Sequence, residues 1–587
     1  MTSALTPVPE RDDTPPQSFS TSAWGLIKPY WVSEDWKAAW GLLVTIVVIN
    51  LLIVGFNVWF NSWNAKFYNA LQTKDVAQYS HQLLLFSAAV PFFIVMAVYR
   101  TYLRQMLEFR WRQWLTTRYL RAWLGEAAFY RIERDRLADN PDQRISDDLQ
   151  SFASNTLQLT LGLFSTLVTL FSFITILWTI GGALTMHLSG SAWTIPGYMV
   201  WAAGIYAIGG SYIIHKVGRS LISINYQQQR VEADFRFGLI RVRENAEPIA
   251  LYDGVRTEHA GAEHIFGRIR DNWWRIMKYT RRLSVVTTFY AQAAIIFPFV
   301  VAAPRYFSGA YTLGILMQIV DAFGTVSGSF SWFIDNYGSL VSWRATTNRL
   351  REFTRVIQST HLREATSPAT EHGGINLHYV DSDSLTTSDL ELALPNGTPL
   401  AAIADITVKP GSRWLVRGPS GAGKSTLLRA FAGLWPFGDG AIDVPVGAHT
   451  MFVPQQSYLP IGTLKAALAY PAPEETFSDE ACRDALRLAR LEGYVERLGE
   501  STHWTRVLSP GEQQRLACAR ILLHKPDFLF LDEATSALDP ANEANIYRLL
   551  TERLPKTAIM SVAHRESLAA LHNEVLDIER ADERAAA

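Results

Sequence analysis

Six stretches within residues 1–340 are apolar over a length that can cross a lipid bilayer as a helix. A bilayer core of about 30 Å needs roughly 20 helical residues. The predicted spans are Ala38–Phe60, Leu83–Tyr99, Leu157–Ile180, Ile195–Ile214, Val285–Ala303 and Leu313–Ile334. We therefore predict a membrane half and a soluble half, in place of the roughly four globular domains that a chain of 587 residues would otherwise indicate.

Basic residues predict how these spans are oriented. The connections after the second and fourth spans are rich in arginine, whereas Gly181–Thr194, after the third, has no Lys or Arg, and the connection after the fifth has only Arg305. The arginines that follow the second span are Arg100, Arg104, Arg110, Arg112, Arg118, Arg121, Arg131, Arg134, Arg136 and Arg144. The positive-inside rule then places both termini and the two long connections in the cytoplasm.

The two cytoplasmic connections are too long and too poor in proline to be plain loops. In the second, Tyr226–Tyr252 has the pattern of a continuous charged helix. We expect the spanning helices to extend into the cytoplasm and return, with bends at Asp139–Arg144 and near Glu247–Asp253. In the first bend, Pro141 breaks the helix and Asp or Asn can cap the next one. Each tip is either a contact surface that couples the two halves or a plain helical turn.

The remaining segments complete the predicted domain organisation. Residues 1–22, rich in Thr, Pro and Ser, predict a disordered tail without the layout of a cleaved signal peptide. A membrane domain over residues 23–358 and a linker over 359–373 precede a soluble α/β domain over 374–587. The net charge of −1 and pI near 6.9 give no indication of a nucleic-acid partner. The two cysteines both lie in the soluble half, so we expect no disulfide.

A phosphate-binding pattern lies in the soluble half, in the stretch Val416–Thr426 that reads VRGPSGAGKST. It stands between a short apolar run, Trp414–Val416, and a predicted helix, Thr426–Leu434. A strand that turns through glycines into a helix N-terminus directs several backbone N–H groups at one point, where a polyphosphate can bind. Lys424 would reach the β- and γ-phosphates, and the Ser425 hydroxyl would ligate Mg²⁺. The alternative is a glycine-rich turn without a ligand.

Four further elements follow in a fixed order and favour the nucleotide site. Gln455 follows a short strand and can reach a metal and an attacking water. The segment Leu508–Gln513 opens a helix with small residues and a hydroxyl. Next comes a buried strand that ends in Asp532, suited to Mg²⁺, and Glu533, suited to act as a general base. His564 follows an apolar strand and could contact a γ-phosphate; taken alone, a histidine there is more often structural.

These elements resemble those of an ATP-binding cassette (ABC) transporter, over nearly the whole chain. The matching segments are Gly418–Ser425 (Walker A), Gln455 (Q-loop), Leu508–Gln513 (signature), Phe528–Asp532 (Walker B), Glu533 (catalytic glutamate), Ser536–Asp539 (D-loop) and His564 (switch histidine). In the family, ATP lies between the Walker A loop of one cassette and the signature of another. One cassette in the chain therefore implies a homodimer.

The resemblance implies roles for individual residues and a fold. The implied nucleotide-binding residues are Gly418, Ser420, Gly421, Gly423, Lys424, Ser425, Thr426, Ser509, Gly511, Glu512 and Asp539. Ser425, Gln455 and Asp532 would bind Mg²⁺, and Glu533, His564 and Gln455 would be catalytic. The implied fold is an α-helical membrane domain of six transmembrane helices, of the exporter type with long cytoplasmic extensions, followed by an α/β P-loop NTPase domain.

Three membrane-half segments narrow the resemblance further. Phe56–Leu71, Asn140–Ile145 and Glu232–Leu251 resemble the BacA/SbmA-like peptide-uptake group with a fused cassette, which is related to the peroxisomal fatty-acyl transporters. Two features depart from the family pattern. The signature reads LSPGE in place of LSGGQ, and Leu394 stands roughly where an aromatic residue usually stacks on adenine. Ser509 and Gly511 remain, so we expect ATP hydrolysis, with adenine contacted from elsewhere.

Polar residues inside the spans predict the substrate path. Asn50, Asn57 and Asn61 share one face of the first predicted span, and Gln318, Asp321 and Asp335 share one face of the sixth. An intramembrane acid such as Asp321 is a functional candidate. The alternative is hydrogen bonding between helices without contact to substrate. A polar cavity on the dimer axis would suit large hydrophilic cargo better than acyl chains.

Taken together, the sequence predicts an ATP-driven homodimeric importer of peptides or other bulky hydrophilic compounds, such as cobalamin, in the bacterial inner membrane. One alternative is an exporter of lipid or fatty-acyl substrates with similar architecture. Another is a proton-driven peptide carrier in which the ATPase only regulates transport. The six spans exclude a non-transport ATPase of the DNA-repair or translation type.

Overall fold

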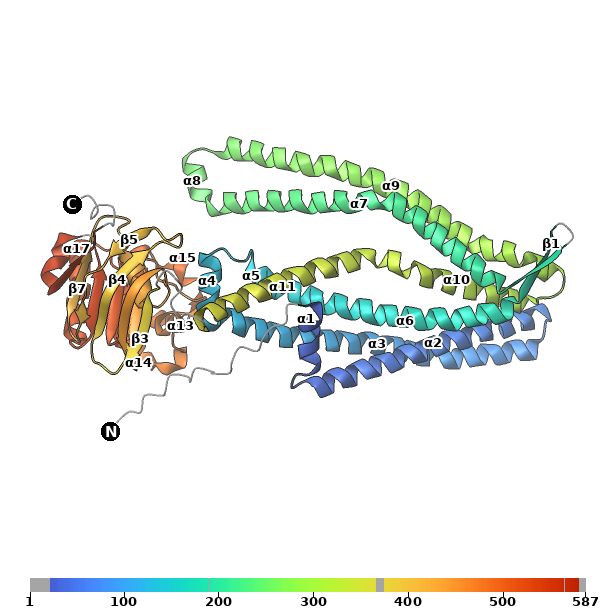
Figure 1. The fold of residues 1–587 in the computed structure, drawn as a ribbon, viewed down its shortest axis with the longest axis horizontal. Helices are drawn as coiled ribbons and strands as arrows, with labels where there is room; N and C mark the ends of the chain where they lie inside the picture. The colour runs from blue at the N-terminus through green and yellow to red at the C-terminus, as the bar shows by residue number, and fades with distance from the viewer. Residues whose placement is uncertain (1–21, 189–190, 366–373, 564, 580–587) are drawn as a thin grey trace. The chain divides into compact units, whose positions relative to one another are not determined.

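The computed structural model describes residues 22–188, 191–365, 374–563 and 565–579 (Figure 1). The chain divides into two compact units, Met1–Glu364 and Ala365–Ala587. The first unit is built from long helices, and the second contains the two larger sheets. Nearly all of the predicted N-terminal tail, residues 1–21, lies outside the described residues, as do residues 366–373 of the predicted linker.

Long helices make up the membrane unit. Six of them carry most of its length: α2 (Trp36–Gln72), α3 (Val76–Leu124), α6 (Leu149–Gly181), α7 (Tyr198–Glu244), α9 (Val255–Phe307) and α10 (Leu313–Asp335). The short α1 (Ala23–Trp31) precedes them, and α11 (Tyr337–Ala365) follows them. Helix α9 alone has 53 residues, far more than a bilayer requires. The predicted extension of spanning helices beyond the membrane is therefore confirmed, and α11 continues into the stretch predicted as linker.

Five described helical segments are long and apolar enough to cross a membrane: Trp36–Thr73, Val76–Arg134, Pro141–Gly181, Val255–Phe307 and Leu313–Thr360. The fourth predicted span, Ile195–Ile214, falls mostly in α7, but its first residues belong to strand β2 (Ser191–Pro196). Helix α7 packs along α9, as Figure 1 shows. A Cβ on Gly210 would lie 1.9 Å from the ring of Tyr290, so glycine is required for this close packing.

The first cytoplasmic connection contains the predicted bend and a second break. Asn140 has a φ of 48°, and Pro141 begins the three-residue helix α5 (Pro141–Gln143). Asn140 makes no side-chain capping bond, so the expected cap is not formed. The additional break falls between α3 and α4 (Ala128–Arg134), where Glu126 and Ala127 have φ values of 50° and 52°. Nothing in the local sequence beyond Gly125 indicates this break.

The second cytoplasmic connection corrects the prediction of a continuous helix over Tyr226–Tyr252. Helix α7 ends at Glu244, and the short α8 (Ala246–Leu251) crosses the tip before α9 begins (Figure 1). Pro248 accounts for the break, because a proline has no N–H to donate to the carbonyl of Glu244 and its ring clashes with that group.

The connection after α6 forms a hairpin of β1 (Ala183–Leu188) and β2, paired antiparallel. Its base is held by Arg305, in the last turn of α9, and by Tyr311, in the connection between α9 and α10. Arg305 Nη1 donates to the carbonyls of Gly181 and Ala183 at 3.0 and 3.1 Å, and the Tyr311 hydroxyl donates to Gly181. Arg305, the single basic residue of the connection predicted after the fifth span, thus has a structural role at the base of the hairpin.

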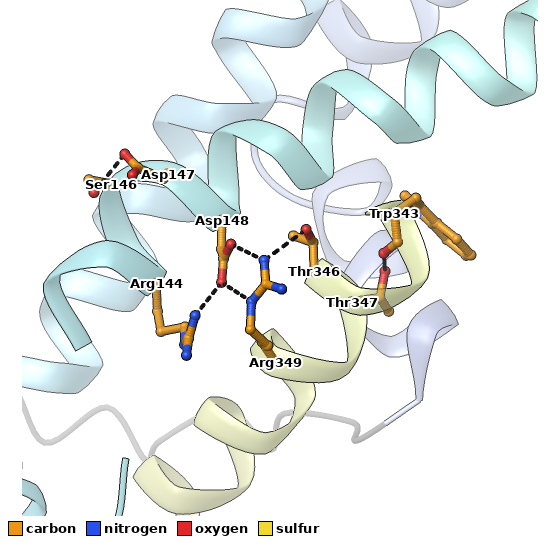
Figure 2. A network of polar contacts seen from close by, with 8 residues as sticks. All are labelled: Arg144, Ser146, Asp147, Asp148, Trp343, Thr346, Thr347 and Arg349. Carbon is orange, nitrogen blue, oxygen red and sulfur yellow. Dashed lines mark hydrogen bonds and ion pairs between the residues drawn. The ribbon is translucent and has the colours of Figure 1, made fainter. Parts of the chain in front are cut away.

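A buried carboxylate fastens α6 to α11 (Figure 2). Asp148, at the end of the π-helix η2 (Arg144–Asp148), accepts hydrogen bonds from Arg349 Nε at 2.9 Å and from Arg144 Nη1 at 3.0 Å. Nearby, Trp343 Nε1 donates to the Thr156 hydroxyl at 2.8 Å. Because α11 is the last helix of the unit, these contacts fix its position against α6.

We expect Asp148→Asn to lower the stability of the purified protein by about 1–2 kcal/mol, because both arginines lose the charge that they bind. Arg349 is 39% exposed, and solvent reduces the loss. The neighbouring Asp147→Asn is the control: Asp147 is exposed and bonds only the Ser146 hydroxyl among the contacts drawn in Figure 2, so we expect a change within about 0.5 kcal/mol. Unfolding in detergent measures both variants, and equal losses would contradict the role of Asp148.

The second unit is organised around a parallel sheet with the order β14-β7-β13-β12-β9. Its strands are β7 (Arg413–Arg417), β9 (Thr450–Val453), β12 (Phe528–Asp532), β13 (Ala558–Val562) and β14 (Glu574–Asp577). A second sheet has the order β3-β8-β4-β5, with β6 paired to β4. It contains β3 (Asn376–Val380), β4 (Leu385–Ala393), β5 (Pro399–Ala402), β6 (Thr407–Val408) and β8 (Gly438–Pro445).

Alternate residues of β12 enter two different cores. Phe528 and Phe530 pack in the cluster that includes Phe431 of helix α12 (Lys424–Phe431). Leu529 and Leu531 pack in the cluster formed with α16 (Pro510–His524) and α17 (Pro540–Arg553). A strand covered on both faces reads as a continuous apolar run, as this one does. Because the strands are parallel, the segments that follow β7, β9 and β12 leave the same edge of the sheet, which is where ligands bind in such folds.

Candidate functional site

The loop after β7 requires its glycines. Gly418, Gly421 and Gly423 have φ values of 150°, 81° and 98°. A Cβ on Gly418 would lie 2.4 Å from the Ile578 carbonyl oxygen, so even a methyl group cannot be accommodated there. The loop leads directly into α12, which begins at Lys424, two residues earlier than predicted, and ends at Phe431. It forms the strand–turn–helix cradle that fits a polyphosphate.

Lys424 lies over this loop. Its side chain is almost fully buried, and Nζ donates to the carbonyls of Gly418 and Pro419 at 2.8 and 2.9 Å. Burial lowers the pKa of Lys424, although the carboxylates of Glu533 and Asp532 act in the opposite direction. The ammonium is therefore held at the cradle, close to the two acids that follow β12.

Two of the three residues predicted to bind magnesium, Ser425 after the loop and Asp532 at the end of β12, meet in the structure. Ser425, in the first turn of α12, donates its hydroxyl to Asp532 Oδ1 at 2.8 Å. A hydroxyl and a carboxylate oxygen are suitable Mg²⁺ ligands beside a phosphate chain. Of the other predicted loop residues, Ser420 is exposed at the loop surface and Thr426 is half-buried in α12.

The predicted general base contacts the glutamine after β9. Gln455 Nε2 donates to Glu533 Oε2 at 3.1 Å, and the pairing of β9 with β12 explains why these residues are close. Glu533 itself has a φ of 49°, in the left-handed region that non-glycine residues seldom adopt. Such conformations often mark functional sites. His564, the remaining predicted catalytic residue, lies outside the described residues.

The signature segment departs from the family pattern in a way that suits its local structure. Ser509 is the N-cap of α16, and Pro510 occupies the first helical position, where its missing N–H has no cost. Glu512 completes a capping box: Oε2 accepts from the Ser509 backbone N–H at 2.9 Å and from its hydroxyl at 2.7 Å. Burial opposes ionisation of Glu512, but the hydrogen bonds from Ser509 and Tyr494 and the charge of Arg515 together lower its pKa.

Two more contacts complete the signature and D-loop region. The Tyr494 hydroxyl donates to Glu512 Oε1 at 3.1 Å, a partner that no motif spacing predicts. Asp539 is the N-cap of α17 and accepts from Asn542 N and Nδ2 at 2.8 and 2.7 Å. These bonds lower the pKa of Asp539. Gly511 faces the D-loop, because a Cβ there would lie 3.5 Å from the Ala537 carbonyl.

At the position where the resemblance implies an adenine-stacking aromatic, Leu394 forms the turn that joins β4 to β5. Its backbone N–H donates to the Thr398 carbonyl at 2.8 Å, and the side chain is 37% exposed. An exposed leucine can pack against a purine but cannot stack on it as an aromatic ring does.

The membrane unit brings three of the predicted substrate-path residues into contact. Asn61 of α2 is fully buried, and its Nδ2 donates to Asp321 Oδ2 at 2.7 Å and to the Gln318 carbonyl at 3.1 Å, both on α10. This is the helix-to-helix hydrogen bonding that was the alternative to substrate contact. Asn50 is buried beside Arg100, whose Nη1 lies 3.5 Å from Asn50 Oδ1.

The two remaining predicted path residues differ in burial. Asn57 is half-buried, and Asp335 is exposed near the end of α10. Two further residues, which the sequence analysis did not select, connect the C-terminal end of α2 to the N-terminal end of α10. Asn69 Oδ1 and Gln72 Oε1 accept from the backbone N–H groups of Gly314 and Leu313, each at 2.9 Å. Side chains of α2 therefore cap the N-terminus of α10.

Comparison with known proteins supports the division of the chain into a helical membrane domain and an ATPase domain. Residues 26–307 match the family "ABC transporter transmembrane region 2", and residues 402–536 match the family "ABC transporter". A solved structure described as a bacterial Atm1-family ABC exporter with ATP bound is similar in fold, with a TM-score of 0.65 at 18% identity over 92% of this chain and 93% of that one. The predicted fold class, a helical membrane domain of exporter type followed by an ATPase domain, is confirmed.

Curated relatives match over nearly the whole chain. The inner membrane ABC transporter ATP-binding protein YddA of Escherichia coli (strain K12) is 34% identical over 94% of this chain and 96% of its own. The chloroplastic ABC transporter D family member 2 of Arabidopsis thaliana is 33% identical over 94% of this chain and 85% of its own. The lysosomal cobalamin transporter ABCD4 of Mus musculus is 27% identical over 93% of this chain and 92% of its own. The chain thus belongs to the ABC transporter family, as a membrane domain fused to one ATPase domain and related to the D-type members.

Proposed function

We propose that two copies of this chain form an ATP-driven importer of bulky hydrophilic compounds, peptides above all, in the bacterial inner membrane. The proposal that the cargo is hydrophilic rests on polar side chains inside the membrane unit. The Asn61–Asp321 bond between α2 and α10 is by itself the helix-to-helix contact described above; what goes beyond it is Asn61 Oδ1, which is buried without a hydrogen-bond partner among the described residues. Amide and carboxylate groups are costly against lipid chains and suit a water-accessible path.

The relatives support the same class of cargo. The murine relative is named a cobalamin transporter, and cobalamin is a bulky polar compound. The segments Phe56–Leu71, Asn140–Ile145 and Glu232–Leu251 add the resemblance to the BacA/SbmA-like group. The E. coli relative is named an inner membrane protein, which supports the proposed location, with the ATPase domain and both termini in the cytoplasm.

Hydrolysis of ATP coupled to transport follows from the family, and we assign its steps to particular side chains. Lys424 would bind the β- and γ-phosphates above the loop, with backbone N–H groups of the loop and of α12. Ser425 and Asp532 would ligate Mg²⁺, which neutralises phosphate charge when bound. Glu533 would take the proton of the attacking water, and Gln455 would hold Glu533 in place. Ser509 of the partner subunit would close the site from the other side.

Uptake by reconstituted vesicles of known orientation tests the proposed cargo. Labelled peptide, cobalamin and acyl-CoA are each supplied in separate experiments on the side opposite the ATPase domain and on the same side as it, and ATP is always supplied on the side of the ATPase domain. We expect ATP-dependent accumulation of the peptide, or of cobalamin, and none of acyl-CoA. Movement of acyl-CoA alone, away from the ATPase side, would instead support a lipid or acyl exporter and contradict the proposal.

A further inference from the structure

The D-loop, Ser536–Asp539, joins the segment that carries Glu533 to helix α17. On one side it is held by Gln514 of the signature helix α16. Gln514 Oε1 accepts from the Ala537 backbone N–H at 2.9 Å, and Gln514 Nε2 lies 3.4 Å from the Ser536 hydroxyl. The Gln514 side chain is buried, so this contact fixes the D-loop against α16.

On the other side, the D-loop is held by a carboxylate that no motif includes. Glu543 of α17 is 3% exposed, and each of its oxygens has a partner. Oε1 accepts from the Thr535 hydroxyl at 2.6 Å, and Oε2 accepts from Arg565 Nη1 at 3.0 Å. Arg565 Nη1 also donates to the Leu538 carbonyl at 2.9 Å, within the D-loop itself.

A buried carboxylate is costly unless it is paired and hydrogen-bonded, and the Glu543 pair satisfies both conditions. The pair joins three separate segments: the residues just after Glu533, the D-loop, and the loop after β13. Thr535 is two residues from Glu533, whose left-handed backbone needs support from its surroundings. None of these side chains touches the phosphate loop in the contacts described above.

We propose that Glu543 and Arg565 are positioning residues for ATP hydrolysis: their ion pair fixes the segment from Glu533 to Asp539, so that the general base is correctly placed. The pair acts on the rate of the chemical step and leaves nucleotide binding to the loop after β7 unchanged. A displacement of about 1 Å at a reacting group can cost about a hundredfold in rate. The effect is therefore expected in kcat and not in KM.

The test compares Glu543→Gln with a matched control in the same domain. Glutamine keeps the size of the side chain but has no charge for Arg565 and only one acceptor oxygen. We expect kcat for ATP hydrolysis to fall by about ten- to a hundredfold, with KM for ATP unchanged within about twofold. The control is Glu500→Gln, which breaks the exposed Arg497–Glu500 pair and should leave kcat within about twofold.

Two further measurements separate positioning from loss of folding. Binding of a fluorescent ATP analogue should stay close to wild type in Glu543→Gln, and thermal unfolding should show that the variant remains folded at the assay temperature even if its stability is lower. A wild-type kcat, or a loss of activity that matches the loss of folded protein, would overturn the proposal. If Glu543→Gln does not fold, Thr535→Val decides the question, because it removes only the hydroxyl bonded to Glu543. A folded Thr535→Val with kcat about tenfold lower supports the proposal, and one with wild-type kcat overturns it.

Discussion

Replacing Glu533 with glutamine is expected to slow ATP hydrolysis by about 10²–10⁴-fold while nucleotide still binds, because the loss of one general base typically has that effect. The substitution preserves the local structure: a glutamine at this position can still accept the hydrogen bond from Gln455 Nε2, which Glu533 accepts at 3.1 Å. It removes only the ability to take a proton from water. Lys424 and the loop after β7, which would bind the phosphates, are unchanged.

Steady-state ATPase assays and nucleotide-binding assays on the same purified variant check this expectation. The control is Glu574→Gln, which changes an exposed acid on β14 of the same sheet and should leave both quantities within about twofold. A Glu533→Gln protein that hydrolyses ATP at the wild-type rate would show that another group is the base. A variant that no longer binds nucleotide would show that Glu533 has a structural role.

A second large effect is expected from mixing two inactive variants. Lys424→Ala removes the phosphate-binding cation, and Ser509→Ala removes the signature hydroxyl; each alone should lower ATPase activity by about 10²–10³. In a mixed dimer, one composite site carries both substitutions and the other carries neither. Activity should therefore reappear when the two chains are combined.

The matched control mixes Lys424→Ala with Glu533→Gln. Both residues belong to the same half of a composite site, so every site in that mixed dimer carries one substitution and activity should stay low. Full activity from a purified, strictly monomeric wild-type protein would contradict the requirement for two chains. So would the absence of recovery in Lys424→Ala and Ser509→Ala dimers whose mixed composition has been verified by differential tagging.

Apolar length predicted the membrane helices well because hydropathy is a local property of the sequence. Breaks in the helices were harder to predict. Helix α7 ends at Glu244 because Pro248 cannot donate a hydrogen bond to the Glu244 carbonyl. This break can be predicted from the position of the proline in the sequence. The left-handed residues Glu126 and Ala127 carry no such signal. Nor did sequence predict the β1–β2 hairpin, whose base depends on Arg305 and Tyr311, more than 100 residues away.

The nucleotide site was predictable for a similar reason: its loop is a continuous strand–turn–helix, and the strand register places Gln455 beside Glu533. Contacts between distant segments were not predictable. Helical spacing indicated which helix face carries Asn61 and which carries Asp321. It could not indicate that these two residues, 260 positions apart in the sequence, form a hydrogen bond. Likewise, Glu543 and Arg565 follow no motif spacing, and only the fold brings them together.

The most direct test of the central claim, that ATP drives uptake, is transport by Glu533→Gln in oriented vesicles supplied with ATP, with and without an imposed pH gradient. The account predicts that uptake falls by a factor comparable to the loss of hydrolysis, about 10²–10⁴, and that a protonophore has little direct effect on the wild-type protein. In a proton-driven carrier, an intramembrane acid such as Asp321 would carry the proton. Wild-type, gradient-dependent uptake by Glu533→Gln, abolished by adding Asp321→Asn, would contradict the account.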